Sequence, residues 1–189
     1  MAYLLATLVG LVFGAAVQQL GASSSLLGAW TATAAQVSAP WLIVAFLAGT
    51  TQDSPRRAMI IGVVVIEAAL LGYFAMTYSP LEIHPWTFDR FVDGMIAITT
   101  RGGYNGGFIV SGLLTGSAFG LLGQRWRVRR WWVSAAFVAG VLCFEPLVRW
   151  ASGRLMSPAE VWMVEVMVGF VVAALFWFSV TVQRRQAAP

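Results

Sequence analysis

Three carboxylic acids lie inside long apolar runs of the sequence, where an ionised side chain is costly. Glu67 lies near the midpoint of its run, and Glu145 and Glu165 lie towards the ends of theirs. An acid inside a membrane segment pairs with another group, carries a proton, or marks a ligand or proton site. All three are therefore candidate catalytic residues, and proton transfer is the chemistry that they offer.

Glu67 is the most deeply placed of these acids. The sequence has no Arg, Lys or His at the same depth, so the carboxyl is expected to be protonated at pH 7 and to face the helix bundle. Phe74 and Tyr78 follow on the same helix face, which gives the acid an aromatic surface to one side. The alternative is a protonated Glu that is bonded to Ser, Thr or a carbonyl for packing alone. Glu67→Gln distinguishes these two interpretations. The substitution removes the donatable proton, so it stops a reaction only if Glu67 is the proton donor.

Glu145 and Glu165 also have structural explanations. A proline follows Glu145, which frees a backbone carbonyl and bends the helix beside the carboxylate. However, Arg149 lies at i+4 on the same face, and an ordinary ion pair is the simpler interpretation. Glu165 lies three residues after Trp162, where water or Arg154 would satisfy its carboxyl at the outer interface.

The other candidate site residues are polar or aromatic side chains inside or beside the apolar runs. On six alternating spans, the deep polar groups all fall in the middle or outer half of the membrane. This placement predicts an acid-lined cavity with aromatic walls that is open to the outer side or the outer leaflet. A lipophilic small molecule is the expected ligand. The expected substrate-binding residues are Gln18, Trp41, Phe74, Tyr78, Asn105 and Trp162.

Several other chemistries lack their motifs. The sequence contains no GxSxG, Walker A or GxGxxG pattern and no aspartate-rich DDxxD pattern. The single histidine, His84, lies beside a proline and near Glu82, which makes at best a weak metal site. We therefore expect neither a metal nor a cofactor.

Composition indicates an integral membrane protein. Of 189 residues, 59% are hydrophobic and 11% are charged, against roughly 25% charged residues in soluble domains. The chain is long enough for about six spans with short connections, so residues 1–189 are expected to form a single all-α polytopic membrane domain. Every basic residue is Arg and lies at an end of an apolar run, which indicates membrane topology and argues against nucleic-acid binding.

Six apolar runs predict six spans. The second run contains Pro40 and a polar first half, so it is either a kinked span or a half-helix preceded by an interfacial piece. Eight of the twelve Arg residues share one side if the spans alternate, and the positive-inside rule places that side, with both termini, in the cytoplasm. The expected location is the cell's inner (plasma) membrane. The runs are 3–20, 26–51, 57–79, 104–123, 131–150 and 160–182.

The longest connection contains an amphipathic segment, Thr87 to Thr99. Its apolar residues recur at helical spacing, which predicts a helix that lies either on the outer leaflet or as a lid, with Phe88, Phe91 and Met95 packed on the outer mouth of the bundle.

Small residues in the first run predict close helix packing. Gly10 and Gly14 form a GxxxG pattern. The helix that packs on this face is either another span of the same chain or a second protein.

Three segments carry a resemblance to known proteins. APWLIVAFLAG at 39–49, SPRRA at 54–58 and GYFA at 72–75 resemble a group of uncharacterised actinobacterial six-span membrane proteins. The size of the chain and the placement of its acids also resemble small integral-membrane terpene cyclases of bacterial indole-terpenoid (drimentine-type) pathways. That resemblance implies a protonation-initiated cyclisation of a prenylated, indole-type substrate, with aromatic faces that stabilise the carbocations.

Two other classes remain open. The solute-binding membrane components of vitamin-type transporters are similar in size, span number and orientation, and Gly10 and Gly14 would suit a partner helix there. A structural or regulatory subunit without a ligand explains everything except an unpaired acid in mid-membrane.

Overall fold

The protein is a bundle of helices. The computed structural model describes residues 1–22, 28–78, 87–90, 92–93, 96, 105–129, 132–154 and 158–186. Within these residues the longer helices are α1 (Ala2–Ala22), α2 (Gly28–Ala35), α3 (Ala39–Thr50), α4 (Pro55–Tyr78), α6 (Asn105–Arg129), α7 (Trp132–Ala151) and α8 (Ala159–Gln186).

The expected polytopic membrane bundle is confirmed. In the described part of the chain, five helices are long and apolar enough to cross a membrane, and α2 and α3 make a sixth span if the bent pair is counted as one. The bend between α2 and α3 is 51°. Pro40 lies in the first turn of α3, where its missing N–H has no helical partner to lose, so the chain restarts a helix there instead of continuing α2.

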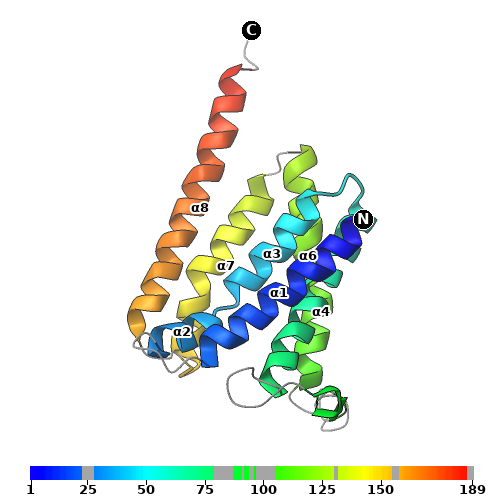
Figure 1. The fold of residues 1–189 in the computed structure, drawn as a ribbon. Coiled ribbons are helices and arrows are strands. Elements are labelled where there is room, and N and C mark those ends of the chain that lie inside the picture. Colours follow the sequence, from blue (N-terminus) through cyan, green and yellow to red (C-terminus); the bar gives the residue numbers. More distant parts are fainter. Residues whose placement is uncertain are drawn as a thin grey trace.

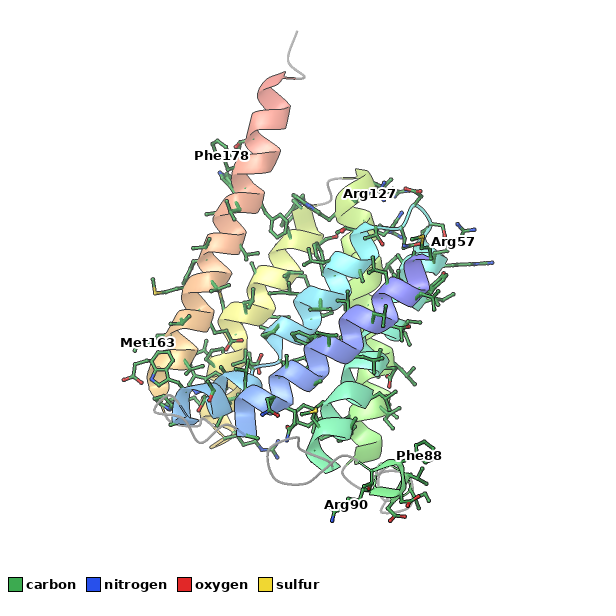
Figure 2. The ribbon with its side chains drawn as sticks, viewed as in Figure 1. Arg57, Phe88, Arg90, Arg127, Met163 and Phe178 are labelled. Carbon is green, nitrogen blue, oxygen red and sulfur yellow. The ribbon has the colours of Figure 1, made fainter. Side chains whose placement is uncertain are left out.

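The helices alternate in direction. Figure 1 shows α1, α4 and α7 running one way and α3, α6 and α8 running the other, with both termini towards the same end of the bundle. Arg57 and Arg127 lie at that end, and Arg90 lies at the opposite end (Figure 2). This is the arrangement that the distribution of Arg residues predicted for six alternating spans.

Reporter fusions test which end faces the cytoplasm. Fusions after Arg57, Arg130 and Arg185 are expected to be active only with cytoplasmic reporters, and fusions after Gly103 and Gly153 only with outward reporters, because the Arg-rich end stays inside. Paired alkaline phosphatase and fluorescent-protein reporters measure this. An outward reporter that is active after Arg57 or Arg130 would reverse the orientation.

Four helices make the tightest part of the bundle. α4 packs on α1, α3 and α6, and α6 also packs on α3. The second group is the pair α7 and α8, which joins the rest mainly through contacts of α7 with α6 and α3. Glycines allow the close approaches within the first group: a Cβ atom at Gly62 or Gly120 would meet the backbone of the facing helix.

The small-residue face of α1 is covered within the chain. A Cβ atom at Gly10 would meet the backbone carbonyl of Val65, and one at Gly14 would meet that of Ala69, both on α4. Of the two alternatives that the sequence left open for this face, the structure shows packing by another span of the same chain.

Alanine substitutions at two helical glycines are expected to have opposite effects on stability. Gly14→Ala forces α1 and α4 apart and should destabilise the bundle by about 1–3 kcal/mol, as overpacking does. Gly140→Ala is the matched control, because nothing lies within 4 Å of a Cβ there, and it should be neutral or slightly stabilising. Unfolding in mixed detergent micelles measures both. Equal effects at the two positions would contradict the packing described for α1.

The amphipathic connection is helical where the structure describes it, at residues 88–90, 92–93 and 96. Figure 2 shows Phe88 at the end of the bundle opposite to Arg57. Phe88 is 65% exposed, so most of its surface is not covered by the bundle, contrary to the prediction that it packs on the outer mouth. Phe91 and Met95 lie outside the described residues.

Candidate functional site

The break between α2 and α3 leaves backbone groups without helical partners, and α7 supplies partners for two of them. The backbone N–H of Ser38 donates to both carboxylate oxygens of Glu145, at 3.0 and 3.1 Å. The carbonyl oxygen of Gln36 accepts a bond of 2.6 Å from the guanidinium of Arg149. An unsatisfied backbone group inside a membrane is costly, so these bonds stabilise the bent span.

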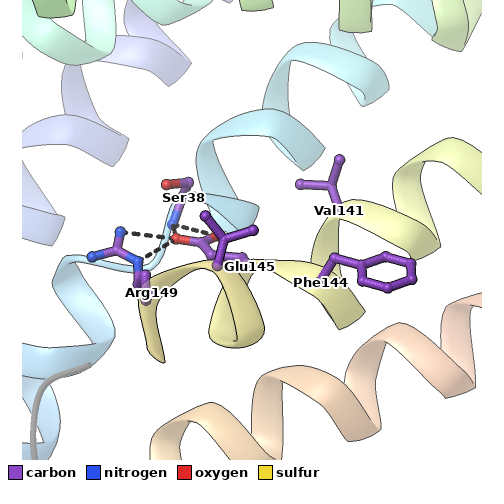
Figure 3. Close-up of a pocket in the computed structure, with 6 residues that line it drawn as sticks. Ser38, Val141, Phe144, Glu145 and Arg149 are labelled. Carbon is purple, nitrogen blue, oxygen red and sulfur yellow. Dashed lines mark hydrogen bonds and ion pairs between the residues drawn. The ribbon is translucent and has the colours of Figure 1, made fainter. Parts of the chain in front are cut away.

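Glu145 and Arg149 form an ion pair on α7 (Figure 3). The Nε atom of Arg149 donates to Oε1 of Glu145 at 2.9 Å, and Nη2 lies 2.8 Å from the same oxygen. The Glu145 side chain is only 9% exposed. The ion pair that the i, i+4 spacing indicated is therefore present. The pair also bonds to the backbone at the break between α2 and α3, and residue types alone do not predict such bonds.

Glu165 approaches this pair from α8. It is 5% exposed, and neither of its carboxyl oxygens has a hydrogen-bond donor among the described residues. Its charged neighbours are the carboxylate of Glu145 and the guanidinium of Arg149. The guanidinium also lies 5.1 Å from the ring centroid of Trp162. The sequence left water or Arg154 as the partner of this acid, and the cation that the structure places beside it is Arg149.

Two carboxyl groups that face each other share a proton readily, because two adjacent negative charges in a buried place are strongly unfavourable. Glu145 already has three donor contacts from Ser38 and Arg149. Glu165 has none in the described part of the chain, so it gains a hydrogen bond only by donating its own O–H to Glu145. Two carboxyl groups thus face each other, and among the described residues only Glu145 has hydrogen-bond donors.

A groove of about 390 Å³ lies beside the ion pair. Its polar residues are Ser38, Glu145 and Arg149, and its apolar walls come from α7: Val141, Phe144 and Val148. Figure 3 shows the ring of Phe144 at one side and the ion pair at the other. Phe144 and Val148 are more than half exposed, so the groove opens sideways from the bundle, towards the bilayer. The sequence predicted a cavity walled by several aromatic residues, whereas the aromatic residue that lines this groove is Phe144.

Glu67 lies elsewhere, between α4 and α6. Its Oε1 atom is buried, has no hydrogen-bond partner among the described residues, and lies 2.6 Å from where a Cβ atom of Gly112 would be. The carboxyl therefore faces the bundle, as expected. It does not join the two acids on α7 and α8, because α4 packs on α1, α3 and α6.

The expected substrate-binding residues are divided between several places. Trp41 packs edge-on against Phe13 and Tyr73, with ring centroids 5.3 and 6.1 Å apart. Phe74 contacts Tyr73 in turn, so these rings fill the space between α1, α3 and α4. Among the candidates whose side chains the structure describes, Trp162 is the one that lies with the acid pair.

Of the three remaining candidates, the structure describes the side chain of Gln18, which is not among the residues that line the groove. Gln18 is half-buried on α1. Tyr78 ends α4 and Asn105 begins α6, and their side chains lie outside the described part of the chain.

Ser38 and Gln36 contribute through their backbone. The signals for them in the sequence were the interruption of an apolar run by Pro40 and the polar first half of that run.

Comparison with protein-family models, with curated proteins and with solved structures found no match.

Proposed function

We propose that the chain is an integral-membrane cyclase that protonates a prenylated, lipophilic substrate and so starts its cyclisation. The observation that supports this most is the Glu165 carboxyl, which is buried without a donor in the described residues and faces Glu145 at the groove. A carboxylic acid that is shielded from water and held near an apolar groove is the group that alkene protonation requires.

The proton path runs from Glu165 through Glu145, since Glu145 lines the groove and Glu165 lies behind it. Glu165 gives its proton to Glu145, which gives it to an alkene carbon of the substrate, and the alkene π electrons form the new C–H bond. The resulting carbocation is attacked by a second alkene and finally loses a proton to the carboxylate pair. The reaction is an isomerisation, so the acids return to their starting state without a co-reactant.

The walls suit a carbocation. Phe144 offers an aromatic face, and the carboxylate left behind carries a compensating negative charge. Val141 and Val148 keep the groove apolar, which excludes water that would quench the cation. The sideways opening allows a lipid-soluble substrate to enter from the bilayer. With both termini in the cytoplasm of an inner (plasma) membrane, the groove lies near the outer leaflet.

A solute-binding membrane component of a transporter is the second candidate. The bent pair α2 and α3 favours it, because broken spans with free backbone groups form binding sites in many transporters. A partner subunit would then use a face other than Gly10 and Gly14, which α4 covers.

A conversion assay with purified protein in lipid nanodiscs separates the two. The cyclase proposal expects a cyclised isomer of a prenylated indole. Saturable binding of a solute without any product would favour the transporter component.

A further inference from the structure

The bent span formed by α2 and α3 contributes a hydrogen-bond donor to the acid pair. Glu145 receives the Ser38 N–H at both oxygens, and Ser38 is the N-cap residue of the 12-residue helix α3. The N-terminus of a helix carries a partial positive charge, so the α3 terminus favours a carboxylate at this position. Arg149 adds a full positive charge at 2.8 Å from Oε1 of Glu145.

Glu165 has the opposite surroundings. It is 5% exposed and has no donor among the described residues, and the partner in front of it is the carboxylate of Glu145. Every donor that the structure places at the pair thus points to one of the two acids. Among the described residues, the charged groups at this place are Glu145 and Arg149 on α7 and Glu165 on α8, and the break between α2 and α3 contributes the Ser38 N–H and the Gln36 carbonyl.

We infer that the break between α2 and α3 is a positioning element of the acid pair, in which the Ser38 N–H, together with Arg149, holds Glu145 as the carboxylate and leaves the proton on Glu165. Ser38 is a positioning residue that acts through its backbone, not through its side chain. This assignment gives the proton path of the proposed function its direction, and to that extent it depends on the proposed function.

Infrared spectroscopy of the protein in nanodiscs tests the assignment without substrate. A protonated carboxyl absorbs above the amide I band, and ¹³C-glutamate labelling identifies it. A band that Glu67→Gln removes belongs to the separate acid on α4 and is set aside. We expect Glu165→Gln to abolish the remaining band and Glu145→Gln to shift it but leave it present. The inference is wrong if Glu145→Gln abolishes the band and Glu165→Gln does not.

Ser38→Pro tests the helix break directly. The backbone of Ser38 has φ −75°, which proline adopts. The change removes the N–H that donates to Glu145, together with the side-chain hydroxyl. Part of the proton should then move to Glu145, so that a new band appears which Glu145→Gln removes. Ser38→Ala is the matched control, because it keeps the N–H, and its spectrum should equal that of the unmodified protein.

Arg149→Met is a second route that leaves the backbone unchanged, should Ser38→Pro fail to fold. It removes the guanidinium donors and is expected to redistribute the proton in the same sense. Unchanged bands in both variants would overturn the inference. Because this readout needs no turnover, a protein that shows the expected bands but never forms a cyclised product would refute the proposed function alone.

Discussion

Glu165→Gln is expected to lower the kcat for conversion of a prenylated indole substrate by about 10²-fold to 10⁴-fold, the usual cost of losing a general acid. The amide keeps the shape of the buried side chain but has no proton to give. Substrate binding and folding should survive, because Glu165 lies behind the residues that line the groove. Rates and dissociation constants measured on the same nanodisc preparation separate these effects.

Two comparisons sharpen this result. Glu160→Gln on the same helix removes an exposed carboxyl and should leave the rate unchanged. Glu67→Gln removes the other buried carboxyl, which lies against Gly112 between α4 and α6, and it should cost far less than Glu165→Gln. A large loss of rate with Glu67→Gln and no loss with Glu165→Gln would identify Glu67 as the proton donor, as the sequence first suggested.

Arg149→Ala is expected to destabilise the bundle by about 3–5 kcal/mol, since removing one partner of a buried ion pair leaves the other charge uncompensated. Two groups lose a donor together: the carboxylate of Glu145 and the carbonyl of Gln36. Reversible unfolding in mixed detergent micelles gives the free energy. The double variant Glu145→Leu with Arg149→Met should be markedly less destabilised than Arg149→Ala, because it removes both charges.

Arg154→Ala is the control for this measurement. Arg154 lies in the exposed turn after α7, and its loss should change the free energy of unfolding by less than about 0.5 kcal/mol. A similar, small effect for Arg149→Ala would show that the helix break does not depend on the pair. A double-mutant cycle with no coupling would lead to the same conclusion.

The spans were predictable because the length of each run of apolar residues can be read from the sequence. The run 57–79 became α4 (Pro55–Tyr78), and 131–150 became α7 (Trp132–Ala151). The run 104–123 ended too early, since α6 continues to Arg129. Polar residues such as Gln124 and Arg127 end an apolar run without ending a helix, and both bind the connection before α4.

The site was predictable only where it depends on one helix. The pairing of Glu145 with Arg149 follows from their i, i+4 spacing. The approach of Glu165 depends on how α8 packs against α7, which no local pattern determines. The bonds to Ser38 and Gln36 involve backbone atoms, which every residue type carries, so the sequence could point to the break but not to its partners.

The position of Glu67 shows the same limit. Its depth in a span was visible, and that depth suggested catalysis. The neighbour that gives its carboxyl room is Gly112, on another helix, where the missing side chain is the relevant feature. Depth alone therefore did not distinguish an acid beside a groove from an acid between two packed helices.

Product formation in D₂O is the most direct measurement of the proposed activity. The purified protein in nanodiscs is given a prenylated indole, and the product is examined by mass spectrometry and NMR. If a carboxylic acid starts the cyclisation, the cyclised isomer carries one solvent deuteron at the former alkene carbon, and Glu165→Gln forms it far more slowly. A cyclised product without deuterium, or no product at all from a correctly folded protein that binds the substrate, would contradict the proposal.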